Sequence, residues 1–267
     1  MWNVIYMNEI PKKQSNAEEY HQLLLRENSF EWFQQRSMEF TVLMSYYKCA
    51  LMEIETKFNV LNVEYSLQYD RNPFNSIKSR LKKLDSILNK LQKQGHELTV
   101  SAMEEHINDI AGIRVVCKFQ DDVYLLADAL LKQDDIELIE KKDYIANPKK
   151  NGYRSLHLIV GVPIFLANEK RIMKVEVQLR TIAMDSWASL EHQLRYKKDV
   201  SFTHEMEKKL QKCAELSAEL DSRMQALRAM VKTENGHIDD DNEILYDKKN
   251  KLLGTSKNIS SSIAFEL

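Results

Sequence analysis

The sequence predicts a core built on a β-sheet, of the α/β or α+β class, with long helical segments before and after it in the chain. The first observation is that six Gly and four Pro are few for 267 residues, which favours helices. The second is that four segments in the middle of the chain are rich in β-branched and apolar residues, as is typical of strands, and they span residues 112–119, 136–144, 153–164 and 172–180. Further helices are predicted near 121–133 and 181–198.

Residues 1–70 are predicted to form a helical N-terminal extension. Ser29 is a candidate N-cap for one long helix, or two abutting ones, ending near Leu61. The helical spacing of apolar residues predicts a buried face that includes Met38, Val42, Cys49 and Met52.

Residues 71–199 are predicted to form the core, and Asn72-Pro73 near its start interrupts the helical pattern. A further helix is expected after this break, with Asn75 as a candidate cap and Gly95 just past its end. Its buried stripe is predicted to consist of Ile77, Leu81, Leu84, Leu88 and Leu91.

Residues 200–232 are predicted to form a C-terminal helix with a heptad pattern. Its seam alternates steps of four and three residues through Met206, Leu210, Cys213, Ser217, Leu220, Met224, Leu227 and Val231. Two interpretations fit this seam: it packs against its own domain, or it forms a subunit interface. The remaining residues, 233–267, turn acidic and then rich in Lys, Asn and Ser, which predicts a flexible tail.

Composition limits the classes of function and the compartment. The formal net charge of −2 provides no global attraction for nucleic acid or an acidic membrane, so general nucleic-acid binding is not expected and any anion must be held by a local cluster. Three widely spaced Cys without a CxxC pair argue against a disulfide framework or a zinc site. The N-terminus lacks a signal-peptide pattern, and the longest apolar run contains Gly161 and Pro163 and is too short to span a bilayer. The cytoplasm is therefore the expected location, with no membrane association.

Several nucleotide-handling and hydrolytic motifs are missing from the sequence. It contains no GxxxxGK[ST] loop, no GxGxxG fingerprint and no GxSxG elbow. No His is followed directly by Asp, so the metal motif of HD-type phosphohydrolases is also missing. Any nucleotide chemistry must use another scaffold.

Two carboxylates are candidates for a metal site. Strand alternation places Glu176, Gln178 and Arg180 on one face of the segment 172–180. Asp109 stands just before the first predicted strand. Carboxylates at neighbouring strand ends can share a Mg²⁺ ion, which prefers oxygen ligands. Each also has a plainer explanation, because Glu176 fits a half-exposed sheet face and Asp109 fits a helix or turn cap.

The segment 149–157 combines basic, aromatic and imidazole side chains where the chain enters a predicted strand. If that strand begins at Tyr153, then Tyr153, Ser155 and His157 share a face. The phenol ring could stack on a nucleobase, and Lys149 and Arg154 could contact phosphates. Ordinary packing is the alternative for a single Tyr or His. Together with the two carboxylates, the segment indicates a site for a phosphorylated ligand that carries a base.

Over about residues 70–232 the sequence resembles a known protein family. The motifs that carry the resemblance are Arg80-Leu81-Lys82, Asp109-Ile110-Ala111-Gly112-Ile113-Arg114, Asn151-Gly152-Tyr153-Arg154-Ser155-Leu156-His157, Glu176-Val177-Gln178-Leu179-Arg180-Thr181 and Trp187-Ala188-Ser189-Leu190-Glu191-His192. In this order and spacing they resemble the RelA/SpoT-type (p)ppGpp synthetase domain. The pattern is most similar to the short, hydrolase-free alarmone synthetases of the RelP/RelQ class, and to the RelP branch among them.

The resemblance implies an α+β fold: a mixed β-sheet surrounded by helices, of the DNA polymerase β-like nucleotidyltransferase type, with helical N- and C-terminal extensions. It implies a monofunctional GTP/GDP pyrophosphokinase of the stringent response. Such an enzyme transfers the β,γ-pyrophosphate of ATP to the 3′-OH of GDP or GTP and releases AMP. The implied cofactor is Mg²⁺, and the implied assembly is a homotetramer. Two alternatives are a catalytically idle relative that binds nucleotides or RNA, and another nucleotidyltransferase of the same fold.

The resemblance also implies roles for individual residues. Asp109 and Glu176 would hold Mg²⁺, and Glu176 would orient or deprotonate the 3′-OH. On the ATP side, Arg80 and Arg114 would flank the adenine, while Lys82 and Lys90 would face phosphates.

On the GDP or GTP side, Tyr153 would stack on the guanine. The other residues implied there are Lys142, Lys149, Asn151, His157, Gln178 and Arg180. Two positions depart from the pattern of relatives. Asp185 stands where long bifunctional relatives carry a His, which puts a guanine contact there in doubt. Lys142 stands where some relatives carry an Arg, so a bidentate contact is lost.

Overall fold

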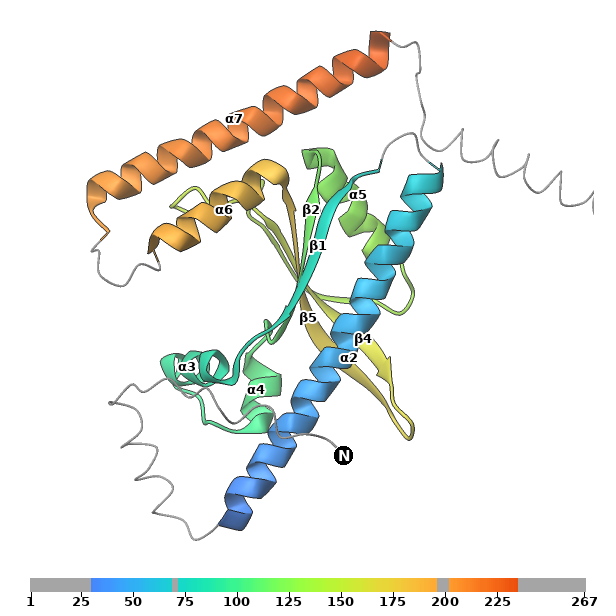
Figure 1. The fold of residues 1–267 in the computed structure, drawn as a ribbon, viewed down its shortest axis with the longest axis vertical. Coiled ribbons are helices and arrows are strands. Elements are labelled where there is room, and N and C mark those ends of the chain that lie inside the picture. The colour runs from blue at the N-terminus through green and yellow to red at the C-terminus, as the bar shows by residue number, and fades with distance from the viewer. Residues whose placement is uncertain (1–29, 69–71, 196–201, 235–267) are drawn as a thin grey trace, which may run out of the picture. The chain divides into compact units, whose positions relative to one another are not determined.

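The computed structural model describes residues 30–68, 72–195 and 202–234. The chain divides into two compact units, one up to Ser45 and one from Tyr46 onward. The second unit contains a five-stranded mixed sheet with the strand order β1-β2-β5-β4-β3 (Figure 1). Its strands are β1 (Phe74–Leu81), β2 (Ala111–Cys117), β3 (Glu137–Asp143), β4 (Leu156–Phe165) and β5 (Lys170–Thr181). The helices are α2 (Phe30–Gln68), α3 (Leu84–Gln94), α4 (Val100–His106), α5 (Gln120–Leu131), α6 (Ile182–Arg195) and α7 (His204–Glu234).

The central strands β2 and β5 run parallel, and every other neighbouring pair is antiparallel. Apolar and polar residues alternate along the central strands. One face of the sheet therefore carries apolar side chains, and these are almost fully buried. Rows of these residues cross the sheet through Ala111–Val175–Val160, Ile113–Val177–Leu158 and Val115–Leu179–Leu156. The polar residues of the same strands lie on the opposite face. The mixed sheet with its helices agrees with the α+β fold that the resemblance implies.

The expected helix between Asn75 and Gly95 is wrong in its first part. Residues Phe74–Leu81 form the edge strand β1, which pairs antiparallel with β2, and α3 begins only at Leu84. An edge strand with polar residues on both faces shows no clear period of two, so Ile77 and Leu81 appeared to continue the helical spacing of α3. In α3 itself Ile87 and Leu91 are fully buried, while Leu84 is exposed. Gly95 ends α3 in the left-handed conformation, as predicted.

The apolar face predicted for the long N-terminal helix is also wrong. Met38, Val42 and Met52 are exposed. From Tyr46 on, the face of α2 that is buried consists of Tyr47, Ala50, Leu51, Ile54, Phe58, Leu61 and Tyr65. The Phe58 ring meets the Phe74 ring edge to face, which packs α2 against β1. The helix has apolar residues on more than one side, so spacing alone did not identify the buried side. The candidate cap Ser29 lies outside the described residues.

The predicted C-terminal helix is confirmed as α7, which lies along α6 (Figure 1). Its predicted seam is not the face that packs inward, because Leu210 is its one buried member and Leu220, Met224, Leu227 and Val231 are exposed. Leu210 and Ser217 of the seam do lie on the inward face, which otherwise carries small and polar residues at heptad spacing: Ala214, Asp221, Gln225 and Arg228. The tail predicted at 233–267 lies outside the described residues beyond the end of α7. Among the described helices, none has the length and apolar character to cross a membrane.

Candidate active site

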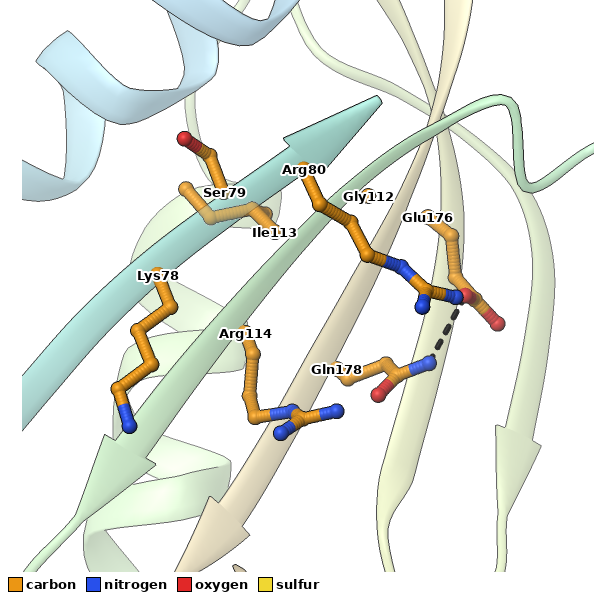
Figure 2. Close-up of a pocket in the computed structure, with 8 residues that line it drawn as sticks. All are labelled: Lys78, Ser79, Arg80, Gly112, Ile113, Arg114, Glu176 and Gln178. Atoms are coloured by element: carbon orange, nitrogen blue, oxygen red, sulfur yellow. Dashed lines mark hydrogen bonds between the residues drawn. The ribbon is translucent and has the colours of Figure 1, made fainter. Parts of the chain in front are cut away.

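Sheet register gathers the polar face into two rows. One row crosses β1, β2, β5 and β4 through Arg80, Gly112, Glu176 and Ile159. The next row crosses the sheet through Lys78, Arg114, Gln178, His157 and Lys142. Figure 2 shows Arg80, Arg114 and Gln178 extending over the same face as Glu176. Residues far apart in the chain therefore become neighbours because the strands that carry them pair.

Two hollows open on this face of the sheet. The first is lined by Lys78, Ser79, Arg80, Gly112, Ile113, Arg114, Glu176 and Gln178 (Figure 2). The second is lined by Glu140, Lys142, Tyr144, Lys149, His157, Ile159 and Glu176. Glu176 lines both of them, so its carboxylate stands where a ligand in one hollow would meet a ligand in the other.

Asp109 follows α4 and stands just before β2. Its carboxylate accepts hydrogen bonds from Lys82 Nζ at 2.6 Å and from Lys90 Nζ at 2.9 Å. Burial alone would raise the pKa of Asp109, but the hydrogen bonds and charges of the two lysines outweigh it and hold this pKa below its usual value. Asp109 is therefore ionised at neutral pH.

Glu176 is held by two partners on its own face of the sheet. Its Oε1 lies 2.9 Å from His157 Nδ1, and its Oε2 accepts a hydrogen bond from Gln178 Nε2 at 2.8 Å. Burial acts to raise the pKa of Glu176, yet contacts with His157 and Gln178 leave it below its usual value. The charge of Asp109 also acts on Glu176, so the two carboxylates are electrostatic neighbours.

Tyr153, His157 and Arg180 form one connected group. Tyr153 Oη lies 2.8 Å from His157 Nε2 and accepts a hydrogen bond from Arg180 Nη2 at 2.6 Å. A neutral His157 satisfies every contact, because Tyr153 can donate to Nε2 while Nδ1–H donates to Glu176. The chain of contacts therefore runs from Arg180 through Tyr153 and His157 to the shared carboxylate.

Asp185, the departure noted in the sequence, anchors two arginines. Its Oδ1 lies 3.2 Å from Arg114 Nη1 and 3.2 Å from Arg180 Nη1. Asp185 stands in the first turn of α6, where a negative charge is favourable. The residue therefore orients Arg114 and Arg180 toward the site.

The ring of Tyr153 has cations close to it. Lys149 Nζ lies 4.9 Å from its centroid and 4.5 Å from that of Tyr144, while Arg180 Cζ lies 5.1 Å from the Tyr153 centroid. Tyr144 also meets the rings of Tyr153 and His157 edge to face. A positive charge thus rests on the aromatic group that the sequence proposed as a base platform.

The structure places three other residues of the segment 149–157 in bracing positions. The strand β4 begins at Leu156, so Tyr153 and Ser155 precede it and the predicted shared strand face is wrong. Ser155 is fully buried and donates to the carbonyl of Leu179. Arg154 donates to the carbonyl of Ile145 and does not line either hollow. Asn151 Oδ1 accepts from the Tyr153 amide and its Nδ2 lies 3.5 Å from Glu191 on α6.

Sequence reasoning missed several residues that line the hollows. Tyr144 and Glu140 line the second hollow, and Lys78 lines the first. A signal for Tyr144 was present, since alternation along the predicted strand 136–144 puts Glu140, Lys142 and Tyr144 on one face. No comparable signal exists for Lys78, because the apolar spacing of its segment predicts a helix.

Comparisons with known proteins match this chain over the segments that build the site. The family model described as "Region found in RelA / SpoT proteins" matches residues 79–201. The GTP pyrophosphokinase YwaC of Bacillus subtilis (strain 168) is 44% identical over 185 residues, which is 69% of this chain and 88% of that protein. The GTP pyrophosphokinase YjbM of the same organism is 33% identical over 188 residues, or 69% of this chain and 86% of that protein.

Solved structures agree with these matches. The small alarmone synthetase 2 of Bacillus subtilis aligns with a TM-score of 0.66 at 40% identity, covering 72% of this chain and 99% of that one. The small alarmone synthetase 1 of Bacillus subtilis bound to its product pppGpp aligns with a TM-score of 0.65 at 33% identity, covering 70% and 94%. The chain therefore belongs to the RelA/SpoT family and, within it, to the small alarmone synthetases.

Proposed function

We propose that this protein is a monofunctional (p)ppGpp synthetase, without hydrolase activity, that transfers pyrophosphate from ATP to the 3′-OH of GDP or GTP. The observation that carries the proposal is that Glu176 lines both hollows. In this reaction the bond from the 3′ oxygen to the β-phosphorus of ATP forms. The bond from that phosphorus to the oxygen of the α-phosphate breaks, so AMP leaves. A carboxylate between donor and acceptor is placed to receive the proton of the 3′-OH.

Asp109 and Glu176 fit the magnesium ion that this reaction requires. Both are carboxylates with pKa values below their usual range, and the charge of Asp109 acts on Glu176. Mg²⁺ is commonly held by one or two carboxylates together with substrate phosphates, so two protein ligands suffice. When bound, the ion would neutralise charge on the phosphate oxygens and bring the two nucleotides together.

The first hollow is assigned to ATP. Its lining provides three cationic side chains, Lys78, Arg80 and Arg114, and Lys82 and Lys90 stand beside Asp109. The Nε of Arg114 is buried and has no hydrogen-bond partner among the described residues, so a polar group of a ligand could satisfy it. Phosphoryl-type transfer depends mainly on such positioning and charge stabilisation.

The second hollow is assigned to GDP or GTP. Lys142, Lys149 and His157 line it, and the ring of Tyr153 lies against His157. The guanine would take the place of the Lys149 ammonium on the ring, and Lys149 would then be free to contact a phosphate. Gln178 lines the first hollow and Arg180 lines neither, so both act on the acceptor side through their hydrogen bonds to Glu176 and Tyr153. Asn151 shapes the loop that carries Tyr153.

Assembly and location remain part of the proposal. We propose a homotetramer, the assembly that the resemblance implies. Contacts between copies are supported by the apolar residues that α2 and α7 expose: Met52, Val60, Val63, Leu67, Leu216, Leu220, Met224, Leu227, Met230 and Val231. The cytoplasm is the proposed location, because the substrates are cytoplasmic nucleotides.

One assay separates this proposal from its alternatives. The protein is incubated with Mg²⁺, ATP and either GDP or GTP, and the products are resolved by anion exchange. AMP together with a guanosine nucleotide carrying a 3′-pyrophosphate supports the proposal. Release of inorganic pyrophosphate would indicate another nucleotidyltransferase, and no reaction would indicate an idle nucleotide-binding relative.

A further inference from the structure

Lys174 makes three hydrogen bonds from a position beside the site. It lies on β5 two residues before Glu176, so both side chains extend from the same face of the sheet. Its Nζ lies 3.0 Å from the carbonyl oxygen of Glu104, 2.9 Å from that of Glu105 and 3.2 Å from Asn108 Oδ1. An ammonium group has three donors, and each of them has an acceptor here.

These acceptors belong to the end of α4 and the turn that follows it. The last carbonyls of a helix have no partner within the helix and carry partial negative charge, so a lysine there both bonds to them and offsets that charge. The next residue after Asn108 is Asp109. On its other side the carbonyl of Ile110 accepts the Lys82 amide at 2.8 Å. The turn that carries Asp109 is therefore tied on both sides, through the Asn108 side chain before it and the Ile110 carbonyl after it.

The carboxylate of Asp109 is held differently. Its present partners are the ammonium groups of Lys82 and Lys90, the side chains assigned above to ATP phosphates. Once those ammonium groups turn to a nucleotide, they no longer restrain the carboxylate. The contacts of Lys174 do not depend on a ligand, because they end on carbonyl and amide oxygens of the protein.

We propose that Lys174 is a positioning residue that fixes Asp109 relative to Glu176, so that the two carboxylates can share one metal ion. The link is short, since Lys174 and Glu176 stand on the same strand and Lys174 reaches the turn that carries Asp109. Lys174 lines neither hollow and acts through Asp109. The inference rests on the proposed function for the role of Asp109 as a metal ligand.

The test compares three single variants with the parent protein. Lys174→Met keeps the aliphatic stem and removes the donors. Lys174→Arg keeps the charge with a different donor geometry. Lys170→Met is the matched control, because Lys170 opens the same strand, is exposed, and contacts only the Phe165 ring, at 5.2 Å, among the interactions found for it.

Two readouts need no turnover: Mn²⁺ binding by electron paramagnetic resonance with a non-hydrolysable ATP analogue, and amide hydrogen exchange over residues 104–110. In Lys174→Met we expect the Mn²⁺ affinity to fall about 10-fold, the lower end of the loss caused by removing a direct partner of a metal ligand, because Lys174 acts on the turn and not on the Asp109 carboxylate itself. Exchange in the segment should accelerate. In the synthesis assay kcat should fall about 10-fold, while the KM for GDP stays within about twofold. Lys174→Arg should recover part of each loss, and Lys170→Met should match the parent.

The inference is overturned if Mn²⁺ affinity and segment exchange in Lys174→Met match the parent. It is equally overturned if Lys174→Met and the control Lys170→Met show the same changes in both KM values and in melting temperature, because the effect would then be general destabilisation. Lys174→Gln, which retains two donors, replaces the Met variant if that variant does not fold. A parent protein that binds Mn²⁺ and the analogue but makes no alarmone would overturn the proposed function, while the two binding readouts would still decide the role of Lys174.

Discussion

At the scale of single residues, the charged groups of the site restrain one another before any ligand is present. Asp109 is held by two lysines, Glu176 by His157 and Gln178, and Asp185 bridges two arginines. Such mutual contacts keep Asp109 and Glu176 ionised and hold Arg114 and Arg180 in place, while Lys82 and Lys90 must exchange Asp109 for the nucleotide when it binds.

Glu176→Gln tests the proposed base at this scale. Gln keeps an oxygen and a nitrogen that can meet His157 and Gln178, so the fold and nucleotide binding should be retained. Loss of the carboxylate should lower kcat about 10²–10⁴-fold, the usual contribution of a general base. Steady-state AMP formation measures this loss, and Glu137→Gln on the exposed side of β3 is the control. A variant that turns over at nearly the parent rate would remove Glu176 from its role.

Tyr153→Ala tests the assignment of the guanine platform. Stacking of a base on an aromatic side chain contributes about 1–3 kcal/mol, so the KM for GDP should rise about 5- to 100-fold while that for ATP changes little. Tyr153→Phe keeps the ring but loses the hydroxyl contacts with His157 and Arg180. The Phe variant should therefore retain most of the affinity for GDP. Equal increases in both KM values for the Ala variant would contradict stacking.

The site residues could be predicted from the sequence to the extent that local patterns place them. Strand alternation identified Glu176, Gln178 and Arg180 as one face, and the position of Asp109 before a strand was correct. The pairing of His157 with Glu176 could not be predicted, because it depends on the register between β4 and β5. The role of Asp185 depends in the same way on where α6 begins relative to β2.

At the scale of elements, α7 braces the loop that carries Tyr153. Gly152 in that loop has φ +87°, and a Cβ added there would overlap the Cβ of Ala214 on α7. Trp187 on α6 donates to the carbonyl of Leu210, which closes α6 and α7 around the same region. The predicted C-terminal helix is thus part of the wall behind the acceptor site, although sequence periodicity indicated a different face.

Gly152→Ala tests this brace. In the variant, alanine must adopt the unfavourable φ, which costs about 1–3 kcal/mol, and its Cβ overlaps that of Ala214. We therefore expect its melting temperature to fall and its KM for GDP to rise. Adding Ala214→Gly should relieve the overlap and recover only part of the loss. Gly95→Ala is the matched control, since Gly95 has φ +75° and open space around its missing Cβ. The brace is refuted if Gly152→Ala costs no more than Gly95→Ala.

Element boundaries show why the rest of the fold escaped prediction. Apolar spacing predicts a helix wherever residues recur every three or four positions, and β1 satisfied this by chance at its junction with α3. In α2 and α7 the burial of one face depends on tertiary neighbours. Apart from Leu210, the inward face of α7 consists of small and polar residues, so hydrophobicity alone does not identify it.

At the scale of the whole molecule, the second unit is joined by polar contacts between distant segments. Asp221 on α7 accepts a hydrogen bond from Thr181 at the end of β5 at 2.6 Å, and Thr181 also accepts the Met184 amide at the start of α6. Arg228 Nη1 lies 3.4 Å from the fully buried Asp122 on α5. These contacts fasten α7 to β5 and α5, and the small apolar cluster of Trp187, Ala188, Leu210 and Ala214 packs α7 against α6.

The pH dependence of stability tests the cost of one of these contacts. Burial raises the pKa of Asp221, against the effects of the Thr181 hydrogen bond and the Arg154 charge. Because the pKa of Asp221 is higher in the folded state than in the unfolded state, protonated Asp221 favours folding. This contribution to the free energy of unfolding is fully present below the unfolded pKa and is lost as pH rises through the folded pKa. Asp221→Asn, which can still accept from Thr181, should therefore raise the melting temperature at pH 7 by at most about 2 °C. A series of thermal melts should show this gain vanish toward pH 4. The prediction is contradicted if the melting temperature of the variant minus that of the parent is lower at pH 7 than at pH 4.

The position of Lys149 over the rings of Tyr144 and Tyr153 has a consequence for ligand discrimination. The ammonium acts as an internal competitor for the base platform, and a base must displace it. A guanosine nucleotide offers the displaced charge a new partner in its own phosphates, whereas the bare nucleoside offers none. Guanosine is therefore disfavoured for two reasons. It has no phosphates to contact the basic side chains, and it leaves the displaced Lys149 ammonium without a new partner.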